Sequence, residues 1–361
     1  MIETSSRPLG KWLVKIENAL SKTLQETTEK EGSQTIDISS AQYIIFSDHH
    51  KGGRNRADDF LIAEKTYHAA LAYYFYMGHT LITLGDVEEL WEEGLETVLK
   101  AYEYTLKLEA QFHCDGRYWR VWGNHDDDWR NPDLVRQYLD PIYGGPPLKV
   151  REAVRLTVMD GKQELGTLFL THGHQGTATS DRFASISKPL VRYGWRALQN
   201  LTGRSMNTPA EDWELRDQHN IAMYKWAARQ EKLALVVGHT HRPVFRSRLH
   251  SAKIRDELEK SKAALMAKPK NTRLRKEVSA LAAELEWVLA QENQKPGPEG
   301  QHRMEKPCYF NTGCCSFLDG DITGIEIVDG EIRLIRWPDD EGSPKPKVLE
   351  QASLKTLFAE L

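Results

Sequence analysis

The 361-residue chain has few cysteines, and their spacing excludes two common uses of this residue. Cys114, Cys308, Cys314 and Cys315 are too few for a disulfide framework in a chain of this size. Their spacing also matches no familiar zinc pattern. We interpret them as small buried hydrophobes in a reduced, cytoplasmic setting.

The sequence also has no leader-like segment, no long apolar run and no marked excess of charge. The first twenty residues contain neither a long apolar core nor a small-residue cleavage site, so we expect no secretory signal. No apolar run approaches the roughly 20 residues of a membrane helix. The net charge of −4 gives no bulk sign of a nucleic-acid binder.

Short apolar runs that end abruptly in polar loops occur five times. Each is typical of a buried strand, and they lie at residues 43–46, 81–84, 118–122, 168–170 and 233–237. Helical patterns at 57–77 and 89–112 separate the first three runs, which predicts an α/β fold. Closing strands are predicted at 307–312, 322–328 and 331–336, with a hairpin turn at Asp329-Gly330.

The remaining segments predict how the chain is organised. Apolar residues at helical spacing predict a helix at 8–30, mostly helical structure at 175–230, and an αα-hairpin at 250–294 that breaks at 268–271. A short helix is predicted at the end of the proline-rich tail. We therefore divide the chain into an N-terminal helix and lead-in (1–42), a main domain (43–245 and 301–337) with a helical cap (175–230), a hairpin insertion with its linker (246–300), and a C-terminal tail (338–361).

Side chains of metal-binding type stand at the end of each of the five apolar runs. They are Asp48, His50, Asp86, Asn124, His125, His172, His239 and His241. Because α/β sheets bind ligands beyond the carboxyl ends of their strands, we expect these residues to converge. One such ending alone would be an ordinary turn or a core histidine, but five in series favour a metal centre.

The residue types indicate which ions would bind. Carboxylate, imidazole and amide oxygen suit Mn²⁺, Fe²⁺, Zn²⁺ or Mg²⁺. Asp86, a single aspartate at its strand end, can bridge two ions. Two ions about 3.5–4 Å apart can clamp a phosphoryl group and activate water for attack on it.

The ordered set Asp48-x-His50, Gly85-Asp86, Gly123-Asn124-His125-Asp126, His172 and Gly238-His239-x-His241 resembles the calcineurin-like metallophosphoesterases. The resemblance covers about residues 43–245 and 307–336. It implies a four-layer αββα sandwich, here with a helical cap and a helical-hairpin insertion. It also implies that Asp48, His50 and His241 hold one metal, that Asn124, His172 and His239 hold the other, and that Asp86 bridges them. His125 would contact the substrate oxygens, and Asp126 would orient its ring.

A closer likeness is to the bacterial UDP-2,3-diacylglucosamine pyrophosphatases. It rests on Ser47–His50, Gly85–Trp91, Gly238–Pro243 and Asn311–Cys314, and on a helical cap in the same place. Arg182, Arg192 and Trp195 in the cap are candidate substrate contacts, although an amphipathic helix pair that only covers the core fits them equally well. That subfamily typically has Arg at the position of His125, and Asp at that of His174.

We therefore expect a dinuclear phosphoesterase, with Mn²⁺ favoured, that acts on a small or lipid-linked phosphate, such as a nucleotide sugar. Peripheral membrane contact and oligomerisation through the hairpin stay open, and no nucleic-acid partner is expected. The alternatives are a nuclease or protein phosphatase of the same fold, or a non-catalytic metal-binding scaffold.

Overall fold

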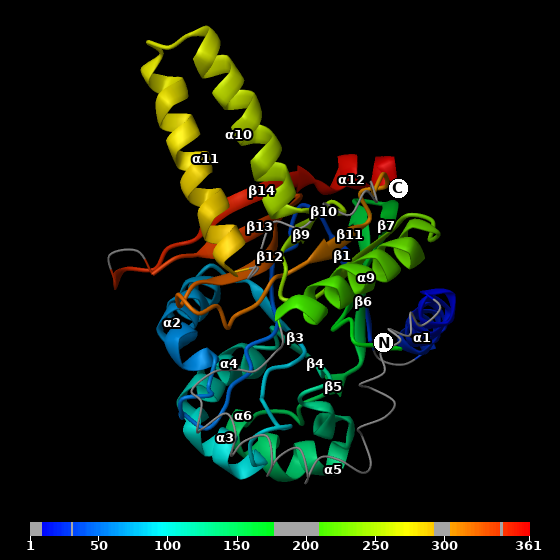
Figure 1. The fold of residues 1–361 in the computed structure, drawn as a ribbon. Coiled ribbons are helices and arrows are strands. Elements are labelled where there is room, and N and C mark those ends of the chain that lie inside the picture. Colours follow the sequence, from blue (N-terminus) through cyan, green and yellow to red (C-terminus); the bar gives the residue numbers. More distant parts are fainter. Residues whose placement is uncertain (1–8, 30–31, 177–208, 292–303, 340–341) are drawn as a thin grey trace, which may run out of the picture.

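Two mixed sheets form the centre of the molecule (Figure 1). The computed structural model describes residues 9–29, 32–176, 209–291, 304–339 and 342–361. The first sheet has the order β14 (Lys347–Ser353), β13 (Glu331–Trp337), β12 (Ile322–Val328), β2 (Tyr43–Phe46), β3 (Thr80–Leu84), β4 (Tyr118–Val121) and β5 (Val150–Arg151). The second has the order β1 (Ser33–Asp37), β6 (Ala153–Asp160), β7 (Gln163–Thr171), β8 (Leu233–Val237), β11 (Tyr309–Asn311), β9 (Val244–Phe245) and β10 (Arg248–Leu249).

Helices cover the outer face of each sheet. The first sheet packs against α2 (Phe60–Tyr76), α3 (Leu95–Ala101) and α4 (Glu103–Cys114), and the second against α1 (Leu9–Glu29) and α9 (Pro209–Ala228). Short helical turns follow β4, namely η1 (Asp127–Arg130), α5 (Pro132–Leu134), η2 (Val135–Leu139) and α6 (Asp140–Tyr143). A hairpin of α10 (His250–Ala267) and α11 (Thr272–Gln291) stands apart, and α12 (Leu354–Glu360) ends the chain. The predicted α/β fold is confirmed, as an α/β sandwich.

The apolar runs are continuous because both faces of each strand are buried. In β2, Ile44 and Phe46 belong to the core beneath the helices, whereas Tyr43 and Ile45 belong to the core between the two sheets. Adjacent strand residues point to opposite faces, so a strand that is covered on both sides consists mainly of apolar residues.

Parallel pairing brings the ends of several strands to the same edge. Strands β2, β3 and β4 are parallel neighbours in the first sheet, and β7 and β8 are parallel neighbours in the second. The polar loops after these five strands therefore leave from matching ends of the two sheets.

Strands β1, β5, β6, β9 and β10 were not predicted, and two predicted segments differ from the structure. The helical pattern expected over 89–112 begins only at Leu95 and is interrupted at Tyr102, because residues 89–94 form a loop that contacts the candidate site. The tail was expected to hold only a short helix, but it also adds β14 beside β13. The turn at Asp329-Gly330 is confirmed, with φ of 53° and 73°. None of the described helices has the length and apolar character to cross a membrane.

Two ion pairs lie wholly buried behind the strand ends. Lys51 pairs with Glu109, and Arg120 pairs with Glu88, and all four side chains are 0% exposed. Arg120 comes from β4, whereas Lys51 and Glu88 come from the loops after β2 and β3. The pairs therefore tie the loop after β2 to helix α4, and the loop after β3 to strand β4. The Glu109 carboxylate also accepts hydrogen bonds from three tyrosine hydroxyl groups. The donors are Tyr67 at 3.1 Å, Tyr118 at 3.3 Å and Tyr143 at 2.7 Å.

We predict that Arg120→Met lowers the free energy of unfolding by about 3–5 kcal/mol, because it leaves the buried Glu88 carboxylate without its cation. Lys107→Met is the matched control, since the Lys107 ammonium is exposed and pairs with exposed Glu103 one helical turn away. Its loss should cost about 0.5 kcal/mol or less. Urea unfolding measures both values, and equal losses would contradict the role given to the buried pair.

Candidate metal centre

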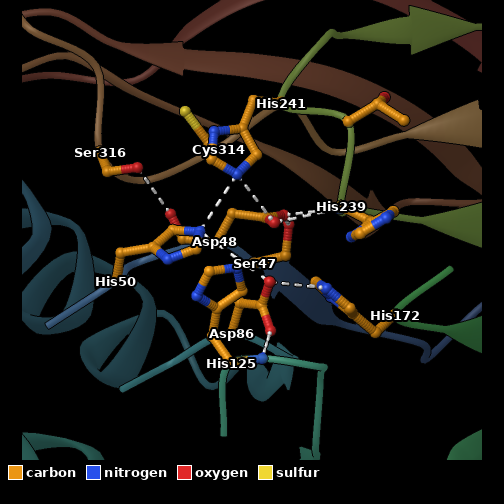
Figure 2. Close-up of polar contacts among 12 residues, drawn as sticks. Ser47, Asp48, His50, Asp86, His125, His172, His239, His241, Cys314 and Ser316 are labelled. Atoms are coloured by element: carbon orange, nitrogen blue, oxygen red, sulfur yellow. Dashed lines mark hydrogen bonds and ion pairs between the residues drawn. The ribbon is translucent and has the colours of Figure 1, made fainter. Parts of the chain in front are cut away.

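The ends of five strands converge where the two sheets meet (Figure 2). The loops after β2, β3 and β4 supply Asp48, His50, Asp86, Asn124 and His125 from the first sheet. The loops after β7 and β8 supply His172, His239 and His241 from the second. The convergence expected from the sequence is thus present, and it joins the two sheets.

Asp48, His50 and His241 form one set of donors, with their ligand atoms all within 4.8 Å of one another. The Nε2 atoms of His50 and His241 lie 3.1 Å apart, and Nε2 of His241 lies 3.2 Å from Asp48 Oδ1. Nδ1 of His50 lies 3.0 Å from Glu89 Oε2. A histidine that donates Nδ1–H to a carboxylate presents the lone pair of Nε2, which is the arrangement that metal-binding histidines adopt.

Asp86, His172 and His239 form a second set, also within 4.8 Å. Nδ1 of His172 lies 2.9 Å from the carbonyl oxygen of Leu84 and must donate to it, because a carbonyl only accepts. In the neutral ring, Nε2 then turns a lone pair toward Asp86 Oδ2 at 2.9 Å. Two acceptors this close repel each other unless a cation or a second proton lies between them.

Asn124 offers a further donor in the loop after β4. Its side chain is buried, and Oδ1 has no hydrogen-bond partner in the part of the chain that the structure describes. A buried amide oxygen without a donor is costly unless it binds an ion or water. The donor chemistry therefore fits a divalent cation.

Asp86 reaches both sets. Its Oδ1 accepts the backbone N–H of His125 at 2.8 Å, and its Oδ2 faces His172 and lies 3.9 Å from Nε2 of His50. Burial opposes its charge, but the imidazoles of His172 and His125 hold the pKa of Asp86 well below its ordinary value. This carboxylate therefore stays ionised at neutral pH, which suits the bridging role.

Charge also sets the state of the histidines. Burial, together with the nearby His219 and His172, keeps the pKa of His239 well below its ordinary value, so the ring is neutral and able to bind a metal. Burial opposes protonation of His50 as well, but Glu89 and Asp86 outweigh it and raise the pKa of His50 to about 10. The same negative field attracts a divalent cation.

Five of the donor residues hold the left-handed backbone conformation that non-glycine residues rarely adopt. Their φ angles lie between 50° and 66°, at Asp48, His50, Asp86, His239 and His241. Each costs about 1–3 kcal/mol and persists only where the surrounding structure enforces it. Such strain clusters at functional sites.

Two glycines leave room for the donors. A Cβ atom at Gly123 would lie 2.2 Å from Asp86 Oδ1, and one at Gly85, whose φ is 84°, would lie 2.5 Å from Cγ of His172. Any side chain at either position would displace a donor.

The structure corrects the role predicted for Asp126. Its carboxylate is fully buried and accepts backbone N–H groups, from Gly123 at 2.6 Å and from Val87 at 2.9 Å. It therefore ties the loop after β4 to the loop after β3, and does not orient the ring of His125. Nδ1 of His125 instead lies 2.7 Å from Glu89 Oε2.

Glu89 and Trp91 are the residues near His125 that sequence reasoning missed. One oxygen of Glu89 faces both His50 and His125, and the Trp91 ring stacks on the His125 ring with centroids 4.4 Å apart. Both lie in the Gly85–Trp91 motif, but nothing in its spacing assigns them a partner.

Of the other residues that the sequence singled out, two histidines lie in the described structure and three cap residues do not. His49, to which the sequence gave no ligand role, packs edge-on against Tyr67 and Phe60 and lies outside the donor sets. His174 packs against Trp122. Three predicted substrate contacts lie outside the described residues, namely Arg182, Arg192 and Trp195.

The described end of the cap does approach the centre. His219 of α9 packs against His239 with ring centroids 5.1 Å apart, and its Nε2 lies 2.5 Å from the carbonyl oxygen of Gly173. Burial lowers the pKa of His219 to about 4, so this ring is neutral.

No protein-family model matches this chain, and no curated protein matches it either. The described His and Asp groups could hold a metal ion, and their donor types suit Mn²⁺, Fe²⁺, Zn²⁺ or Mg²⁺.

We predict that Asp86→Ala abolishes binding of both ions, because this carboxylate belongs to the second donor set and its Oδ2 lies 3.9 Å from Nε2 of His50 in the first. Elemental analysis of protein loaded with Mn²⁺ and then desalted gives the metal content. Asp133→Ala is the matched control, since its carboxylate is exposed and pairs with the exposed Arg136 on the surface. Normal metal content in Asp86→Ala would remove Asp86 from the centre.

Proposed function

We propose that the chain is a calcineurin-like metallophosphoesterase that hydrolyses a phosphate ester or a pyrophosphate bond with two divalent ions. The observation that carries this proposal is the position of Asp86 between two donor sets, on loops that follow parallel strands of two facing sheets. Asp86 belongs to the set with His172 and His239, and its Oδ2 lies 3.9 Å from Nε2 of His50 in the other set. The ordered motifs of the sequence support the same family.

Each residue then has a defined task. Asp48, His50 and His241 would hold one ion, Asn124, His172 and His239 the other, and Asp86 both. Bound divalent ions supply Lewis-acid stabilisation of phosphoryl oxygens and make water a usable nucleophile near neutral pH. Glu89 would orient His50 through Nδ1, so that Nε2 faces the ion.

His125 is the candidate proton donor. Its side chain is 25% exposed, the second most accessible after His241 among the four histidines at the centre with ion pairs to described residues. Burial opposes its protonation, but Glu89 and Asp86 raise the pKa of His125 above the ordinary value. A protonated ring that Glu89 and Trp91 hold in place can donate to a phosphoryl oxygen or to the leaving group.

The substrate class that we propose is a nucleotide sugar or a lipid-linked phosphate. The likeness to the UDP-2,3-diacylglucosamine pyrophosphatases supports it, whereas His125 and His174 depart from that subfamily.

A substrate panel with Mn²⁺ tests the activity and the substrate class together. The panel contains an aryl phosphomonoester, an aryl phosphodiester, UDP-sugars, cyclic nucleotides and single-stranded DNA. We expect hydrolysis that a chelator abolishes and Mn²⁺ restores, with UDP-sugars preferred. Full activity after exhaustive metal removal would refute the dinuclear mechanism, and preference for DNA would refute the substrate class.

We predict that His125→Ala lowers turnover by about 10²–10⁴, the range for a lost general acid or base, while both ions stay bound. His241→Ala should instead lose the ion of the first set. The two variants are matched, because both remove an imidazole that lies close to His50. Since His125 also lies within ligand distance of His50 and Asp86, loss of metal in His125→Ala would make it a ligand and refute its proposed role.

A further inference from the structure

The hairpin of α10 and α11 stands out from the rest of the molecule, with its connecting turn at the far end (Figure 1). Helix α10 has 18 residues. At 1.5 Å per residue, it places the turn about 27 Å from the base of the hairpin.

Specific contacts fix the base of this arm. His250 is fully buried, with Nε2 at 2.9 Å from Glu284 of α11 and Nδ1 at 2.7 Å from Glu350 of β14. The indole N–H of Trp287 donates to Asp319 at 2.6 Å. Ion pairing and packing thus set the direction of the arm, and the buried apolar residues of the base are Ile254, Leu258 and Val288.

Charge is separated along the arm. Residues 260–276, which form the tip, contain seven Lys and Arg and no Asp or Glu. The rest of the hairpin, 250–259 and 277–291, contains two basic and six acidic residues. The acid-free stretch thus comprises the turn and the ends of the two helices beside it, and acidic residues begin at Glu259 and Glu277 on either side. The tip is therefore strongly positive in a chain whose net charge is −4.

The basic side chains of the tip point into solvent. All seven residues are exposed. Within the described chain, Lys262 pairs with Glu259, and Arg275 donates to the carbonyl oxygen of Pro269. The other five basic residues of the tip form no ion pair with any described residue. They are Lys260, Lys268, Lys270, Arg273 and Lys276. Such charges are available to an anionic partner.

The tip also carries an exposed large apolar side chain. Met266, on the last turn of α10, is 80% exposed, and the adjacent Leu265 is only half-buried. An anionic lipid surface attracts basic side chains and also accepts apolar ones below its headgroups. A nucleic acid backbone interacts favourably with the basic side chains only.

We propose that the tip of the hairpin, residues 260–276, docks the protein onto an anionic phospholipid surface. The arm would hold the body of the protein away from the lipid by the length of the hairpin. This proposal does not depend on the phosphoesterase activity.

Sedimentation of the full chain with lipid vesicles tests the proposal. One set of vesicles is phosphatidylcholine alone, and the other is equimolar phosphatidylcholine and phosphatidylglycerol. The tip variant carries Lys268→Glu, Lys270→Glu, Arg273→Glu and Lys276→Glu. The matched control carries the same change of charge on the body, at the exposed residues Lys22, Lys107, Arg136 and Lys355.

We expect the wild type and the control to bind the anionic vesicles and not the neutral ones. The tip variant should bind at least about tenfold more weakly, because each basic residue near an anionic surface contributes favourably. Added salt should weaken wild-type binding. Met266→Ser should weaken binding without changing its salt dependence.

Three outcomes would overturn the proposal. They are no binding of the wild type to anionic vesicles, equal binding by the tip variant, and binding to a DNA duplex in place of vesicles. A thermal melt checks that each variant is folded. If the charge-reversed tip unfolds early, the same four positions changed to Gln replace it in the test.

Discussion

The Asp86 carboxylate joins the two sheets, and the geometry of the candidate metal centre depends on it. Through Oδ1 it accepts the backbone N–H of His125 from the first sheet, and through Oδ2 it faces Nε2 of His172 from the second. The side chain is almost fully buried, so its charge needs close compensation. Imidazole groups supply part of that compensation, and the facing lone pairs leave a place for a cation.

The buried ion pairs position the loops that surround Asp86. Lys51 follows directly after His50, and Glu88 lies two residues after Asp86. Their partners, Glu109 and Arg120, lie in helix α4 and strand β4. Left-handed backbone at the donors costs free energy, and these pairs, together with the backbone bonds of Asp126, oppose relaxation of the loops. Stability of the core and geometry of the site are therefore linked.

One loop connects the hairpin with the metal centre. Ser316 donates its hydroxyl to the backbone carbonyl of Asp48 at 2.9 Å, and Asp319 of the same loop accepts from Trp287 at the base of α11. Phe317 packs against Trp287 between these two contacts. The base of the arm is thus linked to the backbone of the donor Asp48 through this loop, whereas the connecting turn of the hairpin lies at its far end (Figure 1).

The sequence by itself determined the buried strands, the α/β class and the candidate donors, because apolar runs that stop at polar side chains are local patterns. The hairpin turn at Asp329-Gly330 and the break between α10 and α11 could also be predicted, because turn residues act through their own short stretch of sequence. Only the tertiary structure decided that Glu89, and not Asp126, contacts the ring of His125. Asp126 is the next residue in the sequence, whereas Glu89 lies in the loop after β3 and reaches the ring only through the packing of the two loops. The tertiary structure likewise decided that Lys347–Ser353 completes a sheet, because that segment is stabilised by pairing with β13 and has little apolar pattern of its own. Local periodicity predicts elements, but contacts between distant segments depend on how those elements pack.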